Sequence, residues 1–160
     1  MSEAKLRRTI RAERKRARLG KQARCAVCGE DDIRVLQRSG GKTLCASCRL
    51  AAQGKDPYEK HHPAGRWNDP FTVEVSANEH AVFSDMQEDW SLKTRRNPGR
   101  SVLREQAAWL RAAHDIYARA SEVSEEKALV LEELDEFLSL TLEESWPRDF
   151  DQWRKGRRNA

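Results

Sequence analysis

Residues 60–80 read KHHPAGRWNDPFTVEVSANEH and hold three of the four histidines in a chain of 160 residues. Two histidines stand together near the start of this stretch, and the third, His80, closes it. Residues 63–70 contain Pro, Gly and Asn-Asp-Pro, which break helices and predict a loop. Residues 71–76 alternate and are rich in β-branched side chains, which predicts a strand. The predicted order is strand, loop, strand and helix, with histidines at both ends.

The helix is predicted over residues 79–89, with Asn78 as its N-cap. Adjacent residues on an extended segment point to opposite sides, so one of His61 and His62 can face a metal ion while the other faces substrate or water. His80, at the helix start, can approach the same ion. Neutral imidazoles suit Zn²⁺, Ni²⁺ or Mn²⁺, whereas Mg²⁺ would also need phosphate and water oxygens. The stretch therefore indicates a divalent-metal site, and the alternative is a pair of surface histidines in a loop.

A second metal site is predicted from two CxxC pairs with sixteen residues between them. The four cysteines are Cys25, Cys28, Cys45 and Cys48. This spacing fits tetrahedral Zn²⁺, and four thiolate ligands leave no open position for water, so the zinc is structural. Between the pairs, Ile33–Leu36 and the turn at residues 39–42 predict a short hairpin. A redox CxxC is the alternative, and the doubling of the motif argues against it.

Composition sets the context for these sites. Hydrophobic content is 38% and charged content 35%, so the core must be small. A fold with a small core usually needs additional stabilisation, such as a bound metal ion or a disulfide. The net charge of +4 favours a polyanionic partner. No stretch has the length of a signal peptide or of a membrane span, so we expect a cytoplasmic protein without a membrane partner. Thiols stay reduced there, which favours metal binding over disulfides.

The chain on either side of residues 25–93 differs in character. Residues 1–24 form a basic arm, for which two compatible interpretations are a solvated, partly disordered tail and a phosphate-neutralising segment. Residues 101–145 show two apolar stripes at helical spacing, joined near residues 121–124, and predict an antiparallel helical hairpin. Its stripes are predicted to be core or a homodimer contact, and its second helix is acidic. Residues 146–160 form a basic C-terminal tail.

Residues 60–90 resemble the ββα-metal core of the HNH endonuclease family, particularly its phage and bacterial members that carry a zinc ribbon. The resemblance lies in His61-His62 before the loop, the strand at residues 72–76, and His80 at the helix start. It implies that His61 and His80 bind a divalent metal ion (Mg²⁺, Mn²⁺, Ni²⁺ or Zn²⁺) and that His62 is the general base. Asn68 or Asn78 would hold the loop and orient His62.

The resemblance leaves the third metal ligand open. The position one helical turn after His80 is Ser84, a poor ligand, and the neighbouring Asp85 is the better candidate. DNA phosphates are expected to meet arginines before and around this core: Arg7, Arg8, Arg11, Arg14, Arg66, Arg95 and Arg96. Because no further position for a protein ligand is evident, the expected site is sparse.

The sequence thus predicts an α+β chain: a four-cysteine zinc ribbon and a ββα-metal core over residues 25–93, followed by the helical hairpin. The predicted function is metal-dependent hydrolysis of DNA phosphodiester bonds in a bacterial or phage-infected cell. A zinc-stabilised nucleic-acid-binding protein with a degenerate HNH site is the first alternative. An interaction protein that works through its helical hairpin is the second.

Overall fold

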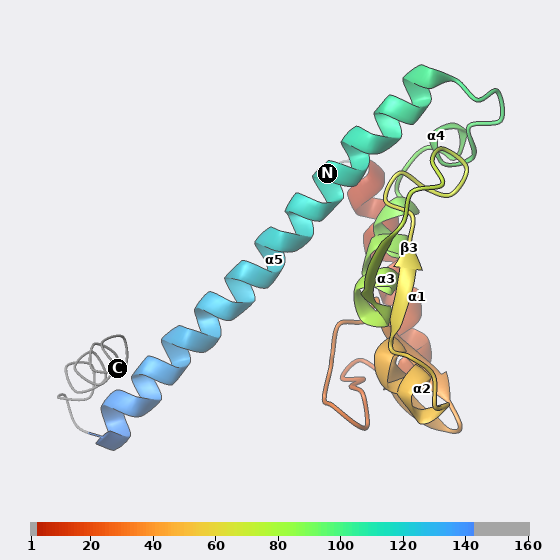
Figure 1. The fold of residues 1–160 in the computed structure, drawn as a ribbon. Helices are drawn as coiled ribbons and strands as arrows, with labels where there is room; N and C mark the ends of the chain where they lie inside the picture. Colours follow the sequence, from red (N-terminus) through yellow and green to blue (C-terminus); the bar gives the residue numbers. More distant parts are fainter. Residues whose placement is uncertain (1–2, 143–160) are drawn as a thin grey trace, which may run out of the picture. The chain divides into compact units, whose positions relative to one another are not determined.

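The computed structural model describes residues 3–142, with side chains described for residues 6–140, and shows an α+β chain. The chain divides into two compact units between Ile116 and Tyr117. The predicted basic tail at residues 146–160 lies outside the described residues. The elements, labelled as in Figure 1, are α1 Glu3–Leu19, β1 Leu36–Ser39, β2 Lys42–Cys45, α2 Ala46–Ala52, β3 Tyr58–His61, β4 Val73–Ser76, α3 Ala77–Gln87, α4 Leu92–Arg96 and α5 Val102–Leu142.

The strands β1 and β2 form an antiparallel hairpin in which Leu36 pairs with Cys45. Its turn is made by Gly40 and Gly41, with φ values of 55° and 78° that favour glycine. The predicted turn is therefore present, but the predicted strand at Ile33–Leu36 is wrong because only Leu36 belongs to β1. A carboxylate oxygen of Asp32 accepts the backbone N–H of Arg34 at 2.9 Å and holds the preceding residues in a turn.

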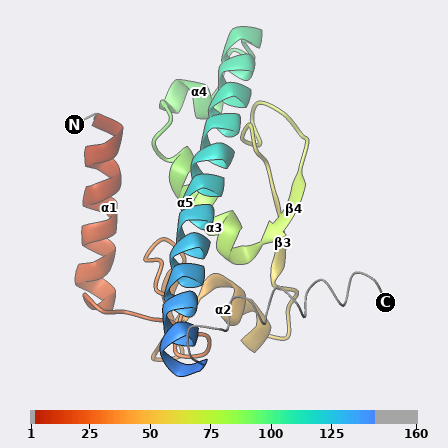
Figure 2. The same cartoon turned by 90° about the vertical axis from the view of Figure 1, so that its left-hand side faces the viewer.

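The second hairpin, β3–β4, pairs His61 with Val73 and leads directly into α3 (Figure 2). The N-cap of α3 is Ser76, whose hydroxyl oxygen accepts the backbone N–H of Glu79 at 3.2 Å. The prediction of Asn78 as N-cap is therefore wrong, because the helix begins two residues earlier than expected. The Asn78 side chain instead accepts the backbone N–H of Ser47 at 3.0 Å and joins α3 to α2.

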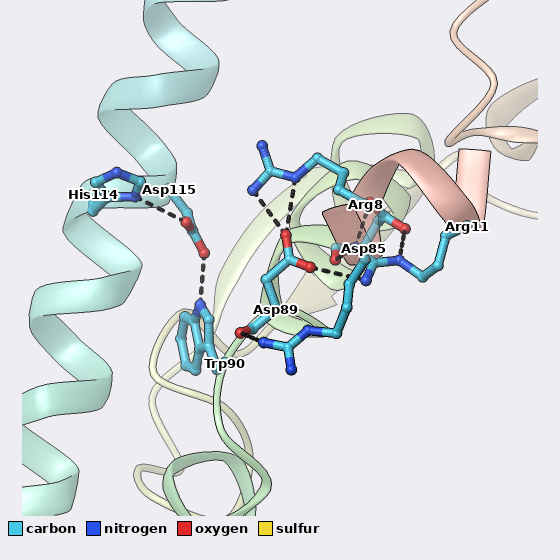
Figure 3. A network of polar contacts seen from close by, with 8 residues as sticks. Arg8, Arg11, Asp85, Asp89, Trp90, His114 and Asp115 are labelled. Atoms are coloured by element: carbon cyan, nitrogen blue, oxygen red, sulfur yellow. Dashed lines mark hydrogen bonds and ion pairs between the residues drawn. The ribbon is translucent and has the colours of Figure 1, made fainter. Parts of the chain in front are cut away.

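Residues 3–19, which belong to the predicted basic arm, form the helix α1, and ion pairs hold it to the rest of the fold. Arg8 and Arg11 of α1 pair with Asp89 at 2.8 Å each, and Arg11 also contacts Asp85 at 3.0 Å (Figure 3). Farther along α1, the Lys15 ammonium donates to the carbonyl oxygen of Arg34 at 2.7 Å. Through these contacts, basic side chains hold α1 against the C-terminal end of α3 and against the cysteine-bearing segment.

The predicted helical hairpin over residues 101–145 is wrong, since α5 runs without interruption through residues 121–124 (Figure 1). Residues 102–142 contain neither Gly nor Pro, and therefore lack the residues that most strongly end helices. Ser124, at the predicted junction, donates its hydroxyl to the carbonyl oxygen of Ala120 at 2.8 Å within the same helix. Several large apolar side chains of the second unit, among them Leu131 and Phe137, are exposed.

Trp90, in the connection between α3 and α4, lies at the centre of a small core with only 5% of its surface exposed. It packs with Ala64, Ala108 and Ala112. Its indole Nε1–H donates to the buried carboxylate of Asp115 at 2.9 Å (Figure 3). This contact fixes the first part of α5 to the ββα segment. No helix among residues 3–142 is long and apolar enough to cross a membrane.

We expect Trp90→Phe to lower the free energy of unfolding by about 2–3 kcal/mol, because it removes the buried donor that pairs with Asp115. Urea denaturation followed by circular dichroism measures this change. Trp67→Phe is the matched control, since Trp67 is 62% exposed and its replacement should change stability by less than about 0.5 kcal/mol. Equal unfolding midpoints for the two variants would contradict this account of the core.

Candidate metal and nucleic-acid sites

The four cysteines form one cluster in which all the Sγ atoms lie within 4.8 Å of one another. Cys25 and Cys28 lie in a turn, and Cys45 N-caps α2, where its Sγ accepts the backbone N–H of Cys48 at 3.4 Å. Cys25 and Cys45 are buried. The predicted four-cysteine cluster is therefore confirmed, and its geometry could hold a structural metal ion such as zinc.

The acid–base properties of the cluster suit a cation. Burial would raise the pKa of Cys25, but backbone hydrogen bonds from Cys28 and Cys45 oppose it and lower the pKa to about 6. Burial and the neighbouring sulfur groups raise the pKa of Cys48 above its ordinary value. Four thiolates at this separation repel one another, so full deprotonation requires a bound cation.

The histidines come together at a second place. His61, the last residue of β3, is 5% exposed, and His80 lies in the first turn of α3. The ring centroids of His61 and His80 are 5.3 Å apart, with an angle of 80° between the ring planes. Phe83 stacks on His61, with its ring centroid also 5.3 Å away. Both histidines and His62 line an open cleft of about 450 Å³. The structure therefore brings the three predicted histidines to one cavity.

Glu59 is a member of this site that the sequence analysis missed. Its Oε2 lies 3.1 Å from Nδ1 of His80, so the carboxylate can accept the Nδ1–H proton and leave Nε2 of His80 free to bind a metal. Glu59 and His61 are two residues apart on β3 and therefore share a face of the strand. That spacing is the signal by which Glu59 could have been found.

The loop after β3 is held by two amides. Asn68 Nδ2 donates to the carbonyl oxygens of Ala64 at 2.8 Å and Thr94 at 2.9 Å. Gln87 Nε2 donates to the carbonyl oxygens of His62 and Pro63, both at 2.9 Å. Of the two asparagines considered for this role, Asn68 lies in the loop that follows His62, and Asn78 makes the α2–α3 contact. Gln87, also missed, follows His80 by two helical turns on the same helix face.

Two buried polar atoms beside the cleft have no hydrogen-bond partner among the described residues. They are Nδ1 of His62 and Oδ1 of Asn68. Leaving such an atom unpaired costs about 1–3 kcal/mol. Nε of Arg49 is unpaired in the same way, and each such atom leaves a polar group that an ordered water could satisfy.

Asp85, predicted as the third metal ligand, is engaged away from the histidines in the structure. Its carboxylate accepts two hydrogen bonds from the Arg11 guanidinium, at 3.0 and 3.2 Å. Asp85 and Asp89 lie one turn apart and both face α1, whereas Ser84 lines the histidine cleft. Within the described part of the chain, the four cysteines alone form a group of three or more close metal-binding side chains. As protein ligands for a metal ion, the histidine cleft therefore offers the imidazoles of His61 and His80.

The predicted DNA-binding arginines separate into two kinds. Arg8 and Arg11 are paired with aspartates, Arg7 donates to the carbonyl oxygen of Asp89, and Arg95 is paired with Glu88. Arg14, Arg66 and Arg96 have no carboxylate within ion-pair distance among the described residues. The paired arginines of α1 hold the fold together, which is why their charge is less available to a polyanion.

We expect stability to depend on the protonation of His61. Burial, with smaller contributions from His80 and His62, lowers the pKa of His61 to about 4. An unfolded histidine has a pKa of about 6.5. Between these values the unfolded chain binds a proton that the folded chain excludes, so the free energy of unfolding falls as the pH drops from about 6.5 to about 4.

In His61→Gln, the free energy of unfolding should no longer show this part of the pH dependence. The cysteine cluster contributes equally to the stability of both proteins. Urea denaturation at several pH values, without added divalent ions, measures the difference. Parallel stability curves for wild type and variant would contradict the assignment.

Comparison with protein families, with characterised proteins and with solved structures finds no match for this chain.

Proposed function

We propose that this protein is a metal-dependent endonuclease that hydrolyses DNA phosphodiester bonds at the His61–His62–His80 cleft, in the manner of the HNH family. One observation carries the proposal. His61 and His80, from a strand and a helix that are separate in the sequence, place their rings 5.3 Å apart at the wall of an open cleft. Arg66 and Arg96 line the same cleft and provide positive charge for a phosphate backbone.

The donor set fits a divalent ion bound by His61 and His80, with water and phosphate oxygens as the other ligands. Such an ion, when bound, would polarise the phosphate and stabilise the charge on the leaving oxygen. Glu59 would orient His80 through Nδ1, as carboxylates commonly do for metal-binding histidines. The buried, neutral state of His61 near neutral pH suits a ligand nitrogen, because a protonated imidazole cannot bind metal.

The other side chains of the cleft and its loop are proposed to act without binding the metal ion. His62 is proposed to accept a proton from the attacking water, a step that a positioned histidine accelerates by about 10²–10⁴-fold. Asn68 and Gln87 hold the loop that carries His62, through the carbonyl contacts on either side of it. Arg66 and Arg96 would neutralise the DNA phosphates that flank the reacting bond.

One observation favours a second candidate, a non-catalytic zinc-stabilised nucleic-acid-binding protein. No third protein ligand joins His61 and His80 among the residues that the structure describes. A site with two protein ligands binds metal more weakly than a complete one. The arginines of the cleft would then bind DNA phosphates, and the strand would not be cut.

Incubation of supercoiled plasmid with zinc-loaded protein and Mg²⁺, Mn²⁺ or Ni²⁺ distinguishes the candidates. We expect relaxed and linear DNA to appear with at least one added ion, and the reaction to stop when that ion is left out. Salt-sensitive DNA binding without cleavage under every ion would support the second candidate and overturn the first.

A further inference from the structure

A second hollow, of about 830 Å³, adjoins the histidine cleft and shares Arg66, Trp67 and Arg96 with it. Residues of the α4–α5 connection, Arg100 among them, line its other side. The proposed chemistry makes no use of Trp67 or Arg100. A hollow that continues from the cleft suggests a path for the strand beyond the reacting phosphate.

Trp67 is the most prominent side chain of this hollow because 62% of its surface is exposed. Its ring is not loose, since the Arg66 guanidinium lies over it at 5.2 Å from the centroid, a cation–π contact. The backbone beneath it is fixed: the Asn68 N–H donates to the carbonyl oxygen of Gly65 at 2.9 Å, and the Asn68 side chain bonds to two further carbonyls. An exposed aromatic ring on a fixed loop is a ready surface for stacking.

The opposite wall is held in an unusual backbone conformation. Asn97 and Arg100 have φ values of 38° and 47°, in the left-handed region that L side chains rarely adopt. Asn97 is buried, and its side chain both accepts from and donates to the backbone of Ser101, at 2.9 and 3.1 Å. These bonds maintain the strained connection and present Arg100 at the hollow.

The charge of the hollow is mixed, with arginine in excess. Arg66, Arg96 and Arg100 have no carboxylate within ion-pair distance among the described residues, in contrast to Arg8 and Arg11 of α1. Two carboxylates, Asp69 and Glu105, also line it. Asp69 is engaged within the fold, because its two oxygens accept from the Phe71 N–H at 2.7 Å and the Trp109 indole at 3.3 Å.

We propose that this hollow binds a stretch of nucleic acid with unpaired bases, with one base stacked on Trp67 and the adjoining phosphates on Arg66, Arg96 and Arg100. Exposed aromatic side chains between cationic ones are the usual means of binding single strands, since every base offers a π-face. Bases inside a duplex are already stacked on one another and cannot reach the ring. The proposal deepens the proposed function and rests on it for the identity of the polyanion as DNA.

The test is binding of a fluorescently labelled twelve-nucleotide single strand, compared with a duplex of the same sequence, without added divalent ions. We expect Trp67→Ala to weaken single-strand binding about tenfold or more, and Trp67→Tyr to restore it to within about threefold of wild type. Duplex affinity should change by less than about twofold in both variants. Unchanged single-strand affinity in Trp67→Ala, or equal loss for both DNA forms, would overturn the proposal.

Arg100→Gln tests the phosphate contact against Arg24→Gln as a matched control. Arg24 is exposed and pairs with Asp31 at 3.2 Å, away from the hollow. We expect the Arg100 variant to bind the single strand more weakly and with a smaller salt dependence, and the Arg24 variant to match wild type. Equal effects in both would overturn the role of the hollow.

Because binding is measured without the catalytic ion, failure of cleavage and failure of the hollow are distinguishable. A protein that prefers single strands through Trp67 but cuts nothing would retain the hollow and lose the nuclease. A protein that cuts plasmid but shows no contribution of Trp67 would retain the nuclease and lose the hollow.

Discussion

Cys45→Ser is expected to abolish zinc binding and to unfold the cysteine-bearing segment around β1, β2 and α2. A serine hydroxyl is a poor zinc ligand, and Cys45 also N-caps α2. The apparent free energy of binding at structural zinc sites is about 10–16 kcal/mol and contributes directly to folding. This binding free energy is comparable to the whole free energy of unfolding of an ordinary domain, which is about 5–15 kcal/mol.

The effect should extend beyond the ribbon. Ala46 and Leu50 of α2 pack with Ala77 of α3, and the Ser47–Asn78 bonds join the same two helices. Zinc analysis combined with hydrogen exchange measures both changes. We expect zinc to fall from about one ion per chain to none, with lost protection in α2 and at the start of α3. Ala51→Ser, on the exposed side of α2, is the control and should keep its zinc. Full zinc occupancy and unchanged protection in Cys45→Ser would contradict the structural role.

His62→Ala is expected to reduce the rate of plasmid cleavage by about 10²–10⁴-fold, because it removes the proposed general base. DNA affinity and zinc content should remain at the wild-type level, since His62 is proposed neither as a metal ligand nor as a phosphate contact. Steady-state rates at saturating divalent ion measure the effect.

His114→Ala serves as the matched control. His114 has 76% of its side chain exposed on α5 and lies away from the cleft, so its replacement should leave the rate unchanged. A His62→Ala variant that cleaves within about threefold of wild type would exclude His62 as a general base.

The features that the sequence predicted well have local causes. Two CxxC pairs can close on one ion with little help from distant residues, and the four Sγ atoms do meet. The order strand, loop, strand and helix follows from turn residues and β-branched side chains, and it agrees with β3, β4 and α3. The meeting of His61 and His80 depends on that order, which is why it could be anticipated.

The features that it missed depend on tertiary contacts. Nothing local distinguishes Asp85 as a metal ligand from Asp85 as a partner of Arg11, seventy-four residues earlier in the chain. The basic composition of α1 resembles that of a solvated tail, because its partners, Asp85 of α3 and Asp89 just after it, are distant in the sequence. In α5, two apolar stripes suggested two helices, but Ser124 between them donates its hydroxyl to Ala120 within one continuous helix.

We propose that His61 and His80 together hold a divalent ion distinct from the metal expected at the four cysteines. Calorimetric titration of the zinc-loaded protein with Mn²⁺, with His80→Ala as the comparison, measures binding at this site. We expect one exchangeable Mn²⁺ per chain in wild type, about tenfold or more weaker binding in the variant, and the same zinc content in both. Equal Mn²⁺ affinity in the two proteins, or no Mn²⁺ binding by wild type, would contradict the proposal.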